Sequence, residues 1–455
     1  MDYGILACVP IAVLIIGLLI TKRMVEMIVV STIIGAIIVY RSNVFDGYIE
    51  LCYGALTNSS FQFLILLLLG FGGMIKLFEK SGAFQGFSNI ISKFANTPKK
   101  SMVATWIMGI LVFVDDYLNV LSVSFAMKDI TDKHGIPREH LAYGVNSMGA
   151  CVCVLIPFTS WAAFAIGVIN EQGLGFTDYV RALPYMFFPI IAILLCLLVA
   201  VGIVPKVGPI KKAYERVASG GSVMPSVQEE GGTSFINMES SDEGMSGVKP
   251  TSPLNFFIPI IVLIIVMLLC NNDVIHGIYA AIIVQLILYL AQRIMTLAEF
   301  VDAFLSGITG MASLSFIIMF AYVLSAENDA LGFAPYIIDK LTQVIPPTLL
   351  PMIAFITVAF VAFAAGSFWI LIVITVPIFV PLAASMGMDP VIVVAAIMSG
   401  VAFGSKICFY SDAVFMTSAG TGVSNMTQIK AIAPYVLGSA ALAAICFAIV
   451  GFVTA

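Results

Sequence analysis

Acidic and amide side chains interrupt the apolar stretch FVDDYLNVLSVSF, residues 113 to 125. In a helix, Asp115 and Asn119 share one face because they are four residues apart, while Asp116 points about 100° away. Carboxylate and amide oxygens are ligands of hard cations, and a carboxylate also carries a proton. A charge in an apolar layer costs at least about 2.5 kcal/mol, so its presence indicates an ion or proton site. The alternative is that these residues cap a helix end near water.

A helix break supplies the second group of polar residues, in LAYGVNSMGACVCVLIPFTSWAAFAIG, residues 141 to 167. Pro157 interrupts the helical pattern, and Thr159 and Ser160 follow it. Hydroxyls and released carbonyls at a break make a natural site for Na⁺. The alternative is a proline kink whose free carbonyls are bonded by the same hydroxyls. The residues that we expect to provide oxygens to Na⁺ are Asp115, Asn119, Thr159 and Ser160.

The third group lies in SGVAFGSKICFYSDAVFMTSAGTG, residues 399 to 422, which contains Lys406, Ser411 and Asp412. Because breaking a buried ion pair costs about 3 to 5 kcal/mol, Lys406 is expected to pair with an aspartate at depth. Alternatively, Lys406 extends to an interface. A weaker fourth signal is Ser367 in FAAGSFWILIVITVP. The candidate ion- or substrate-binding residues are Asp115, Asp116, Asn119, Asn146, Thr159, Ser160, Ser367, Lys406, Ser411 and Asp412.

The composition is that of a membrane protein. Of 455 residues, 60% are hydrophobic and 10% are charged, whereas about 25% are charged in soluble domains. The formal charge of −5 provides no basic surface for a polyanion, which excludes nucleic acid as a partner. Three histidines accompany eight cysteines that lie mostly in apolar runs, so we expect buried thiols and no cofactor besides Na⁺ or H⁺ as the coupling ion.

Twelve apolar blocks of nearly spanning length divide the chain. The first block lacks the features of a cleaved signal peptide and is expected to remain as a span. A polar stretch at residues 206–253 separates six blocks from six, and its Gly, Ser and Glu content predicts a flexible cytoplasmic linker. The expected domains are a first membrane repeat, 1–205, this linker, and a second membrane repeat, 254–455.

The two halves resemble each other in several segments at an offset of about 250 residues. At an offset of 252, Asp412 takes the position of Ser160. Inverted repeats require an odd number of crossings per half, so one block in each half must not cross. Blocks 141–170 and 390–420 contain polar residues with Gly or Pro and are predicted to be re-entrant hairpins or broken helices. The predicted fold is all-α and polytopic, with two inverted repeats of about five spanning helices each.

The distribution of positive charge supports this topology. With the N-terminus outside, 14 of the 21 Lys and Arg residues fall inside and Lys406 falls in the membrane. The basic residues then predicted outside are Arg41, Lys128, Lys133, Arg138, Arg181 and Lys340.

Three segments resemble the signature regions of the NhaC-type Na⁺/H⁺ antiporter family, within the wider ion transporter superfamily. They are VDDYLN (114–119), LAYGVNSMGACVCVLIPFTSWAAF (141–164) and CFYSDAVFMTSAGTG (408–422). The resemblance covers nearly the whole membrane portion, and DDYLN is its most specific part. It implies inverted repeats, broken or re-entrant helices and Na⁺- or H⁺-coupled exchange. Some relatives move organic substrates such as malate and lactate, and relatives of this architecture often form homodimers through a scaffold domain.

This chain departs from the family pattern at two places. An acidic residue often stands where Asn146 lies, and an Asp-His pair often stands where Ser405 and Lys406 lie. A lysine ammonium can occupy the place of Na⁺. The departures therefore favour coupling to protons, or an organic anion or zwitterion as the substrate.

These features predict a secondary active transporter of a bacterial plasma membrane, with alternating access at a central site. The alternative is a Na⁺- or H⁺-coupled carrier of a small organic solute, an amino acid or a carboxylate. A passive channel is a further alternative, which saturable exchange would exclude. An enzyme is not expected, because the apolar blocks contain no Ser/His or HExxH arrangement. The expected partners are membrane lipid, the transported ion or small molecule, and a second copy in a homodimer. The aromatic residues expected to recognise an organic solute are Phe158, Trp161, Phe368, Trp369 and Tyr410.

Overall fold

The computed structural model describes most of the chain as α-helices. Among the described residues, Phe61–Lys80, Pro390–Ile407 and Asn425–Thr454 are long and apolar enough to cross a membrane, and three bent helix pairs raise the number of such segments to six. Other apolar helices are shorter. The structure describes residues 3–21, 24–83, 86, 94–225, 249–270, 273–333, 336, 340, 345–365, 368–408 and 411–454.

Helices make up both halves of the chain and part of the linker between them. The first half contains α1 (Val9–Thr21), α2 (Met24–Tyr40), α3 (Val44–Thr57), α4 (Ser59–Lys80), α6 (Pro98–Leu111), α7 (Asp116–Lys133), α8 (Arg138–Leu155), α9 (Ser160–Asn170), α10 (Phe176–Ala182) and α11 (Phe187–Val201). The linker contains α12 (Gly208–Ala218). The second half contains α14 (Leu254–Leu269), α15 (Val274–Ala291), α16 (Leu297–Gly310), α17 (Ala312–Leu331), α19 (Leu350–Ala365), α20 (Trp369–Ser385), α21 (Pro390–Ile407), α22 (Asp412–Thr421) and α23 (Asn425–Thr454).

The helix bounds repeat at the offset that the sequence indicated. Adding 252 to the bounds of α8 gives 390 and 407, which are the bounds of α21. The same offset carries α7 onto α20 and α9 onto α22 with a difference of one residue at one end of each. The order of helices therefore repeats through the part of each half that contains the candidate site.

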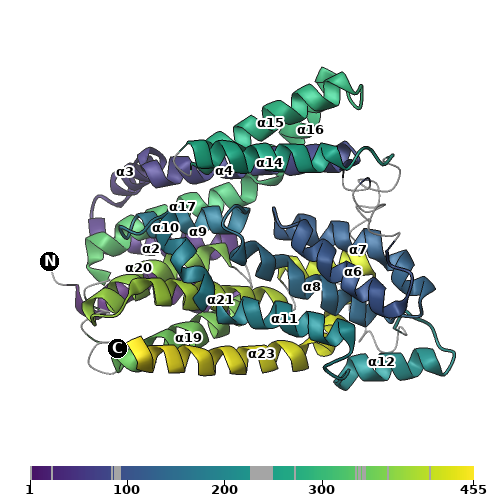
Figure 1. The fold of residues 1–455 in the computed structure, drawn as a ribbon. Coiled ribbons are helices and arrows are strands. Elements are labelled where there is room, and N and C mark those ends of the chain that lie inside the picture. Colours follow the sequence, from purple (N-terminus) through teal and green to yellow (C-terminus); the bar gives the residue numbers. More distant parts are fainter. Residues whose placement is uncertain are drawn as a thin grey trace.

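Two bundles, each with helices from both halves, make up the molecule (Figure 1). In the flanking bundle, which comprises α1–α4 and α14–α17, α4 packs on α15 and α16, and α2 packs on α17. In the site bundle, which comprises α6–α11 and α19–α23, α7 and α8 pack on α22, and α8 also packs on α21. Contacts of α4 with α9 and of α17 with α20 join the two bundles. The two halves are therefore interlocked in space.

Helices α6 and α7 form a hairpin whose open ends meet at one face. Ser101, near the start of α6, shares a hydrogen bond of 2.9 Å with Nδ1 of His134, which follows α7. At the other end, Nδ2 of Asn119 donates to the carbonyl oxygen of Val112, in the turn between the helices, at 3.0 Å. The chain enters and leaves on the same side. The block at 101–127, which the sequence suggested as a crossing, therefore belongs to a re-entrant hairpin.

Helices α8 and α9 form the broken crossing that follows. Their axes differ by 41°, so the chain keeps its general direction through the break at residues 156–159. The expectation of a re-entrant hairpin at 141–170 is wrong, and its stated alternative, a broken helix, describes this block. Residues 101–127 were expected to cross and residues 141–170 to turn back, whereas the structure has the reverse. The number of crossings is the same, but the loop between α7 and α8 now lies on the face opposite to the expected one.

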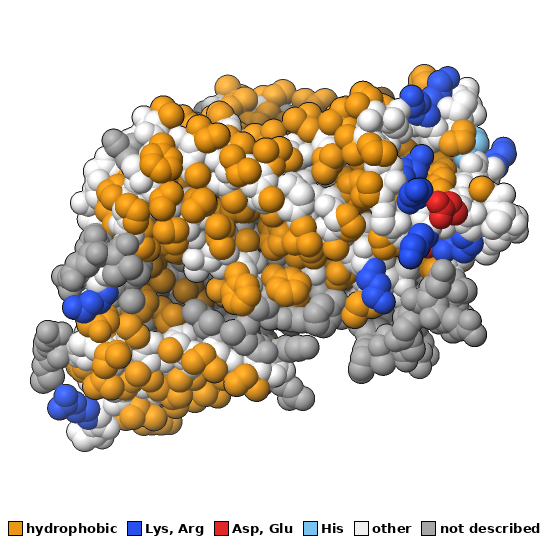
Figure 2. All heavy atoms as spheres, turned by 90° about the horizontal axis from the view of Figure 1, so that it is seen from below, with side chains coloured by type: hydrophobic (Ala, Val, Ile, Leu, Met, Phe, Trp, Pro, Cys, Tyr) orange, Lys and Arg blue, Asp and Glu red, His pale blue; other side chains and the backbone are white. Residues whose placement is uncertain are grey.

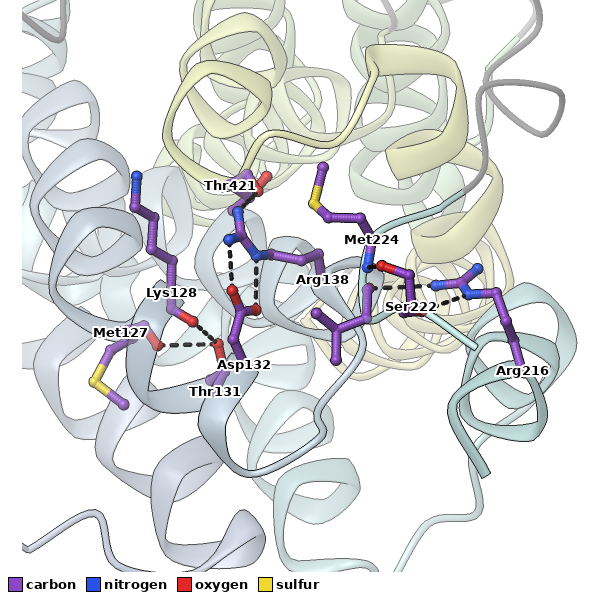
Figure 3. A network of polar contacts seen from close by, with 10 residues as sticks. Met127, Lys128, Thr131, Asp132, Arg138, Arg216, Ser222, Met224 and Thr421 are labelled. Carbon is purple, nitrogen blue, oxygen red and sulfur yellow. Dashed lines mark hydrogen bonds and ion pairs between the residues drawn. The ribbon is translucent and has the colours of Figure 1, made fainter. Parts of the chain in front are cut away.

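Arg138 shows which face this loop occupies (Figure 3). Its main-chain nitrogen donates to the carbonyl oxygen of Val223 in the linker at 3.0 Å. Its guanidinium donates to the two carboxylate oxygens of Asp132, at 2.7 and 2.6 Å, and to the carbonyl oxygen of Thr421 at 2.6 Å. The loop, the linker and the C-terminal end of α22 therefore share one face, here called the linker face.

The prediction for three basic residues is consequently wrong. Lys128, Lys133 and Arg138 were expected on the face opposite the linker because residues 101–127 were counted as a crossing. The hairpin returns the chain to its starting side, and the bond from Arg138 to the linker places this end of the hairpin at the linker face.

The linker is docked at both of its described ends. α12 lies against α8 and α23, and Arg216 donates to the two carboxylate oxygens of Glu139 at 2.8 and 3.1 Å. At the other end, the main-chain nitrogen of Thr251 donates to the carbonyl oxygen of Gly82, beyond α4, at 3.1 Å. One end is thus fixed to the site bundle and the other to the flanking bundle. The middle of the predicted flexible linker, 226–248, lies outside the described residues.

The outer surface is apolar over a wide area. Figure 2 shows the side of the molecule that lies at the bottom of Figure 1. Hydrophobic side chains cover much of it, and Lys and Arg side chains gather at the end where α12 lies. On α23, the side chains of Leu437, Ile445 and Phe452 are 53%, 56% and 66% exposed. Exposed apolar area of this extent is typical of a surface that faces lipid.

Replacing Glu139 with Gln should destabilise the linker face. The side chains of Glu139 and Arg216 are 4% and 19% exposed, so removing one charge leaves the other poorly compensated and should cost about 3 kcal/mol. Glu215→Gln is the matched control, because Glu215 lies 3.9 Å from Lys211 and these side chains are 63% and 66% exposed. Thermal unfolding in detergent should show a lower midpoint for Glu139→Gln alone. Equal midpoints for the two variants would contradict this role.

Candidate functional site

Asp115 is buried at the tip of the first hairpin. It is 3% exposed and directly precedes α7, so its carboxylate lies at the positive end of a helix. Oδ1 accepts from the main-chain nitrogen of Tyr117 at 3.1 Å. Oδ2 accepts from Oγ of Ser160, across the break between α8 and α9, at 2.8 Å. Both oxygens are hydrogen-bonded, as a buried carboxylate requires.

Asn119 holds the hairpin tip closed. Its Nδ2 donates to the carbonyl oxygens of Gly109 and Val112, which ties α7 to the end of α6. Its Oδ1 is buried and makes no hydrogen bond among the described residues. Of the amide group, only Oδ1 is therefore free to face a cation. Asp116, in the first turn of α7, is 1% exposed.

Thr159 and Ser160 play different parts at the first break. The hydroxyl of Thr159 accepts from the main-chain nitrogen of Ala162, at 3.1 Å, and donates to the carbonyl oxygen of Cys153. Thr159 therefore caps α9 and satisfies a carbonyl that the break releases, as in the kink alternative. The hydroxyl of Ser160 is the one that reaches the carboxylate of Asp115.

Ser411 repeats the arrangement of Thr159 in the second half. Its hydroxyl donates to the carbonyl oxygen of Ser405 at 2.9 Å and accepts from the main-chain nitrogen of Val414 at 3.3 Å. Ser411 and Ser405 follow Thr159 and Cys153 by 252 residues. Both breaks are thus held open by a hydroxyl that bonds to main-chain groups on its two sides.

Two candidates fall outside the described part of the molecule. Nothing of Ser367 is described, and Asp412 is described as the first residue of α22 but without its side chain. Tyr410 is outside as well. At the offset of 252, Ser367 and Asp412 take the positions of Asp115 and Ser160. In the second half of the sequence, a hydroxyl thus takes the position of the acid Asp115, and an acid takes the position of the hydroxyl of Ser160.

Lys406 is buried where α21 meets α8. It is 1% exposed, and its Nζ donates to the main-chain oxygen of Asn146 at 2.6 Å. The alternative that Lys406 extends to an interface is wrong, because its side chain is enclosed. Lys406 was expected to neutralise Asp412, Asp115 or Asp116. A pair with Asp115 or Asp116 is not among the ion pairs of the described residues, and the side chain of Asp412 lies outside them.

The charged candidates surround one part of α8. A Cβ added to Gly149 of α8 would lie 3.9 Å from the Cβ of Asp116, and Nζ of Lys406 bonds to the main-chain oxygen of Asn146 in the same helix. Asn146 is 4% exposed, and neither the oxygen nor the nitrogen of its side-chain amide has a hydrogen-bond partner among the described residues. Carboxylates, an ammonium group and an unbonded amide therefore converge in the site bundle.

Aromatic side chains border the carboxylate site. Trp161 follows Ser160 at the start of α9 and is 1% exposed. Its ring lies 6.0 Å from that of Phe368 and 5.2 Å from that of Trp369, between ring centroids. Phe158 lies apart from these rings and stacks on Phe176 at 6.2 Å. Three of the described aromatic candidates are thus brought together, and Phe158 is not.

Glu327 is a buried acid that the sequence reasoning missed. It lies in α17 of the flanking bundle and is 0% exposed. A Cβ added to Gly35 in α2 would lie 2.1 Å from its Oε2, so the carboxylate rests on the backbone of that helix. The following residues, Asn328 and Asp329, gave the segment the look of a polar helix end. The signal that could have indicated a buried acid was the position of Glu327 inside α17, four residues before the helix ends.

Replacing Asn119 with Leu should loosen the hairpin tip. The variant keeps a similar volume but leaves the carbonyl oxygens of Gly109 and Val112 without this donor, which should cost about 1 to 3 kcal/mol. Ser122→Ala is the matched control, since Ser122 is 6% exposed and its Oγ has no hydrogen-bond partner among the described residues. Thermal unfolding should distinguish the two. A tip that is as stable in Asn119→Leu as in Ser122→Ala would refute this function of the amide.

Comparison with known proteins identifies the family and the fold of the chain. The family model of the Na⁺/H⁺ antiporter family matches residues 152–452, more than half of the chain. An uncharacterised protein of Haemophilus influenzae is 22% identical over 487 residues, covering 98% of this chain and 90% of that one. The crystal structure of the Alcanivorax borkumensis YdaH transporter shares the fold, with a TM-score of 0.58 at 13% identity over 90% of each chain. Neisseria gonorrhoeae MtrF is similar at a TM-score of 0.47 and 16% identity, over 90% of this chain and 86% of that one. The chain is a multi-pass membrane transporter that belongs to the Na⁺/H⁺ antiporter family.

Proposed function

We propose that this transporter is a secondary active carrier that exchanges cations by alternating access, with Asp115 as its main Na⁺ or H⁺ site. The observation that carries this proposal is the bond of 2.8 Å between Ser160 and the buried carboxylate of Asp115. It joins a hairpin tip to a helix break, where released main-chain groups and hydroxyls favour a hard cation.

Binding of either ion removes the negative charge from the site. A proton on Asp115 neutralises it directly, while Na⁺ is held by the carboxylate and by the oxygen of Ser160 once that hydroxyl turns. Because the two ions use the same carboxylate, they compete. A neutralised site crosses an apolar region at lower cost than a charged one, so occupancy permits the change between the two faces. Asp116, Oδ1 of Asn119 and Asp412 are proposed as further ligands.

The two halves are proposed to be inverted repeats with the linker face in the cytoplasm of a bacterium. In support, the start of α8 and the end of α22, which occupy opposite ends of equivalent units, meet at Arg138. Moving Lys128, Lys133 and Arg138 to this face raises the number of Lys and Arg residues proposed inside from 14 to 17 of 21. This is a stronger bias than the earlier topology gave.

A second candidate is a Na⁺- or H⁺-coupled carrier of a small organic solute, an amino acid or a carboxylate. Lys406 favours it, because its buried amino group bonds to the main-chain oxygen of Asn146 and, when protonated, offers a positive charge to an anionic group. The unbonded amide of Asn146 would add a donor and an acceptor. Under this proposal the cation binds at Asp115, as in the first.

Replacing Asp115 with Asn should abolish coupled transport without unfolding the protein. The variant keeps the shape of the side chain but cannot bind a proton or Na⁺ by charge. Proteoliposomes with an interior pH dye should respond saturably to Na⁺ pulses in the wild type and not in Asp115→Asn. Asp129→Asn, on the exposed part of α7, is the matched control and should retain the response. Unaltered exchange in Asp115→Asn would remove this residue from the mechanism, and flux that rises linearly with Na⁺ would indicate a channel.

Cysteines placed at two loops should test the proposed topology. In a variant whose eight native cysteines are serine, Lys133→Cys should react with an impermeant maleimide from the cytoplasmic side and Lys340→Cys from the opposite side. Lys133 lies at the linker face, at the end of α7. Labelling of Lys133→Cys from outside the cell would reverse the assignment of the linker face.

A further inference from the structure

The tip of the α6–α7 hairpin and the start of α20, which takes the equivalent position in the second half, differ in chemical character. At the offset of 252, Phe368 takes the position of Asp116, and Trp369 takes that of Tyr117. Phe368 and Trp369 are 3% and 6% exposed, so both are enclosed. The hairpin tip is therefore acidic and suited to a cation, whereas the corresponding point at the start of α20 is aromatic.

Trp161 connects these aromatic rings to the carboxylate site. It stacks on Phe368 with an angle of 25° between the rings and lies at 44° to Trp369. Its neighbour Ser160 bonds to the carboxylate of Asp115, so the residue that bears the indole ring directly follows, in α9, the residue that holds the carboxylate. α9, from the first half, packs here on α20, from the second. The start of α9 thus carries, at consecutive residues, a contact with the aromatic rings at the start of α20 and a bond to the carboxylate of Asp115.

The indole N–H of Trp161 is a hydrogen-bond donor without an acceptor among the described residues. Nε1 is buried and makes no hydrogen bond among the described residues. An indole N–H is a donor only, and when buried it usually finds an acceptor. By contrast, Nε1 of Trp106 donates to the carbonyl oxygen of Ile193 at 3.0 Å. The acceptor for Trp161 is therefore best supplied by a ligand.

We propose that the aromatic cluster of Trp161, Phe368 and Trp369 is the subsite for a planar ring of the transported solute. The ring stacks on the cluster, and an acceptor atom of the solute receives the bond from Nε1 of Trp161. Lys406 then attracts a negative group of the same solute while Asp115 holds the coupling cation, which indicates an amino acid or carboxylate that bears a ring. This inference rests on the second candidate of the proposed function and specifies its solute.

Tryptophan fluorescence provides a direct test, because two of the three tryptophans belong to the cluster. The purified protein is titrated with L-histidine, L-phenylalanine, nicotinate and benzoate as ring-bearing probes, and with L-alanine, L-lactate and NaCl as ring-free ones. At least one ring-bearing probe should change the emission saturably, while the ring-free probes should not. Trp161→Phe keeps a ring for stacking but lacks the donor, so half-saturation should rise about tenfold, with Trp369 as the remaining reporter. Trp106→Phe, the matched control, should bind as the wild type does.

The outcomes separate this inference from the proposed function. If no ring-bearing probe changes the emission while Na⁺ pulses still drive saturable exchange, the subsite is refuted and the cation carrier stands. Equal affinity for ring-bearing and ring-free probes, or wild-type affinity in Trp161→Phe, would also overturn the subsite. If Trp161→Phe does not fold, Phe368→Leu takes its place, because it removes the stacking partner and should weaken binding similarly. If the wild type neither binds a ring-bearing probe nor shows Na⁺-driven exchange, both proposals are refuted.

Discussion

A carboxylate enclosed in an apolar bundle is the constraint on which the site depends. Transfer of a charge from water into a low-dielectric interior is costly unless hydrogen bonds or an opposite charge compensate it. Asp115 receives one bond from the start of its own helix and one from Ser160 on another helix. Both donors exist only because α6 and α7 form a hairpin and α8 and α9 are separated by a break. Interruptions of regular structure therefore supply what a continuous helix cannot.

The breaks are themselves stabilised by side chains that do not contact the charge. Thr159 and Ser411 each bond to main-chain groups on the two sides of a break. In an apolar layer the carbonyls released by a break have no water to accept bonds from, so the hydroxyl removes most of the cost of the irregular backbone. The adjacent position, Ser160 in one half and Asp412 in the other, is then available for different chemistry.

Much of the site could be predicted because polar residues in apolar runs have few structural explanations. Asp115, Ser160 and Lys406 stood out on that ground, and the repeat offset was visible in the sequence. The direction of the chain at residues 112–115 could not be predicted, since hydrophobicity measures burial and says nothing about reversal. The reversal depends on local bonds from Asn119. Likewise, spacing paired Asn119 with Asp115 on one face, but spacing cannot show that its amide would be used by the backbone.

The interlocking of the two halves has a consequence for how the protein is made. α8 packs on α21, which follows it by 252 residues in the chain. Ribosomes add about 5 to 20 residues per second, so tens of seconds pass between the synthesis of these partners. Throughout that interval the newly made first half holds a buried acid and an incompletely covered hairpin in the bilayer. These polar elements gain their covering helices only when the second half has been made, so a mutation at the interface between the halves acts on biogenesis as well as on the stability of the finished fold.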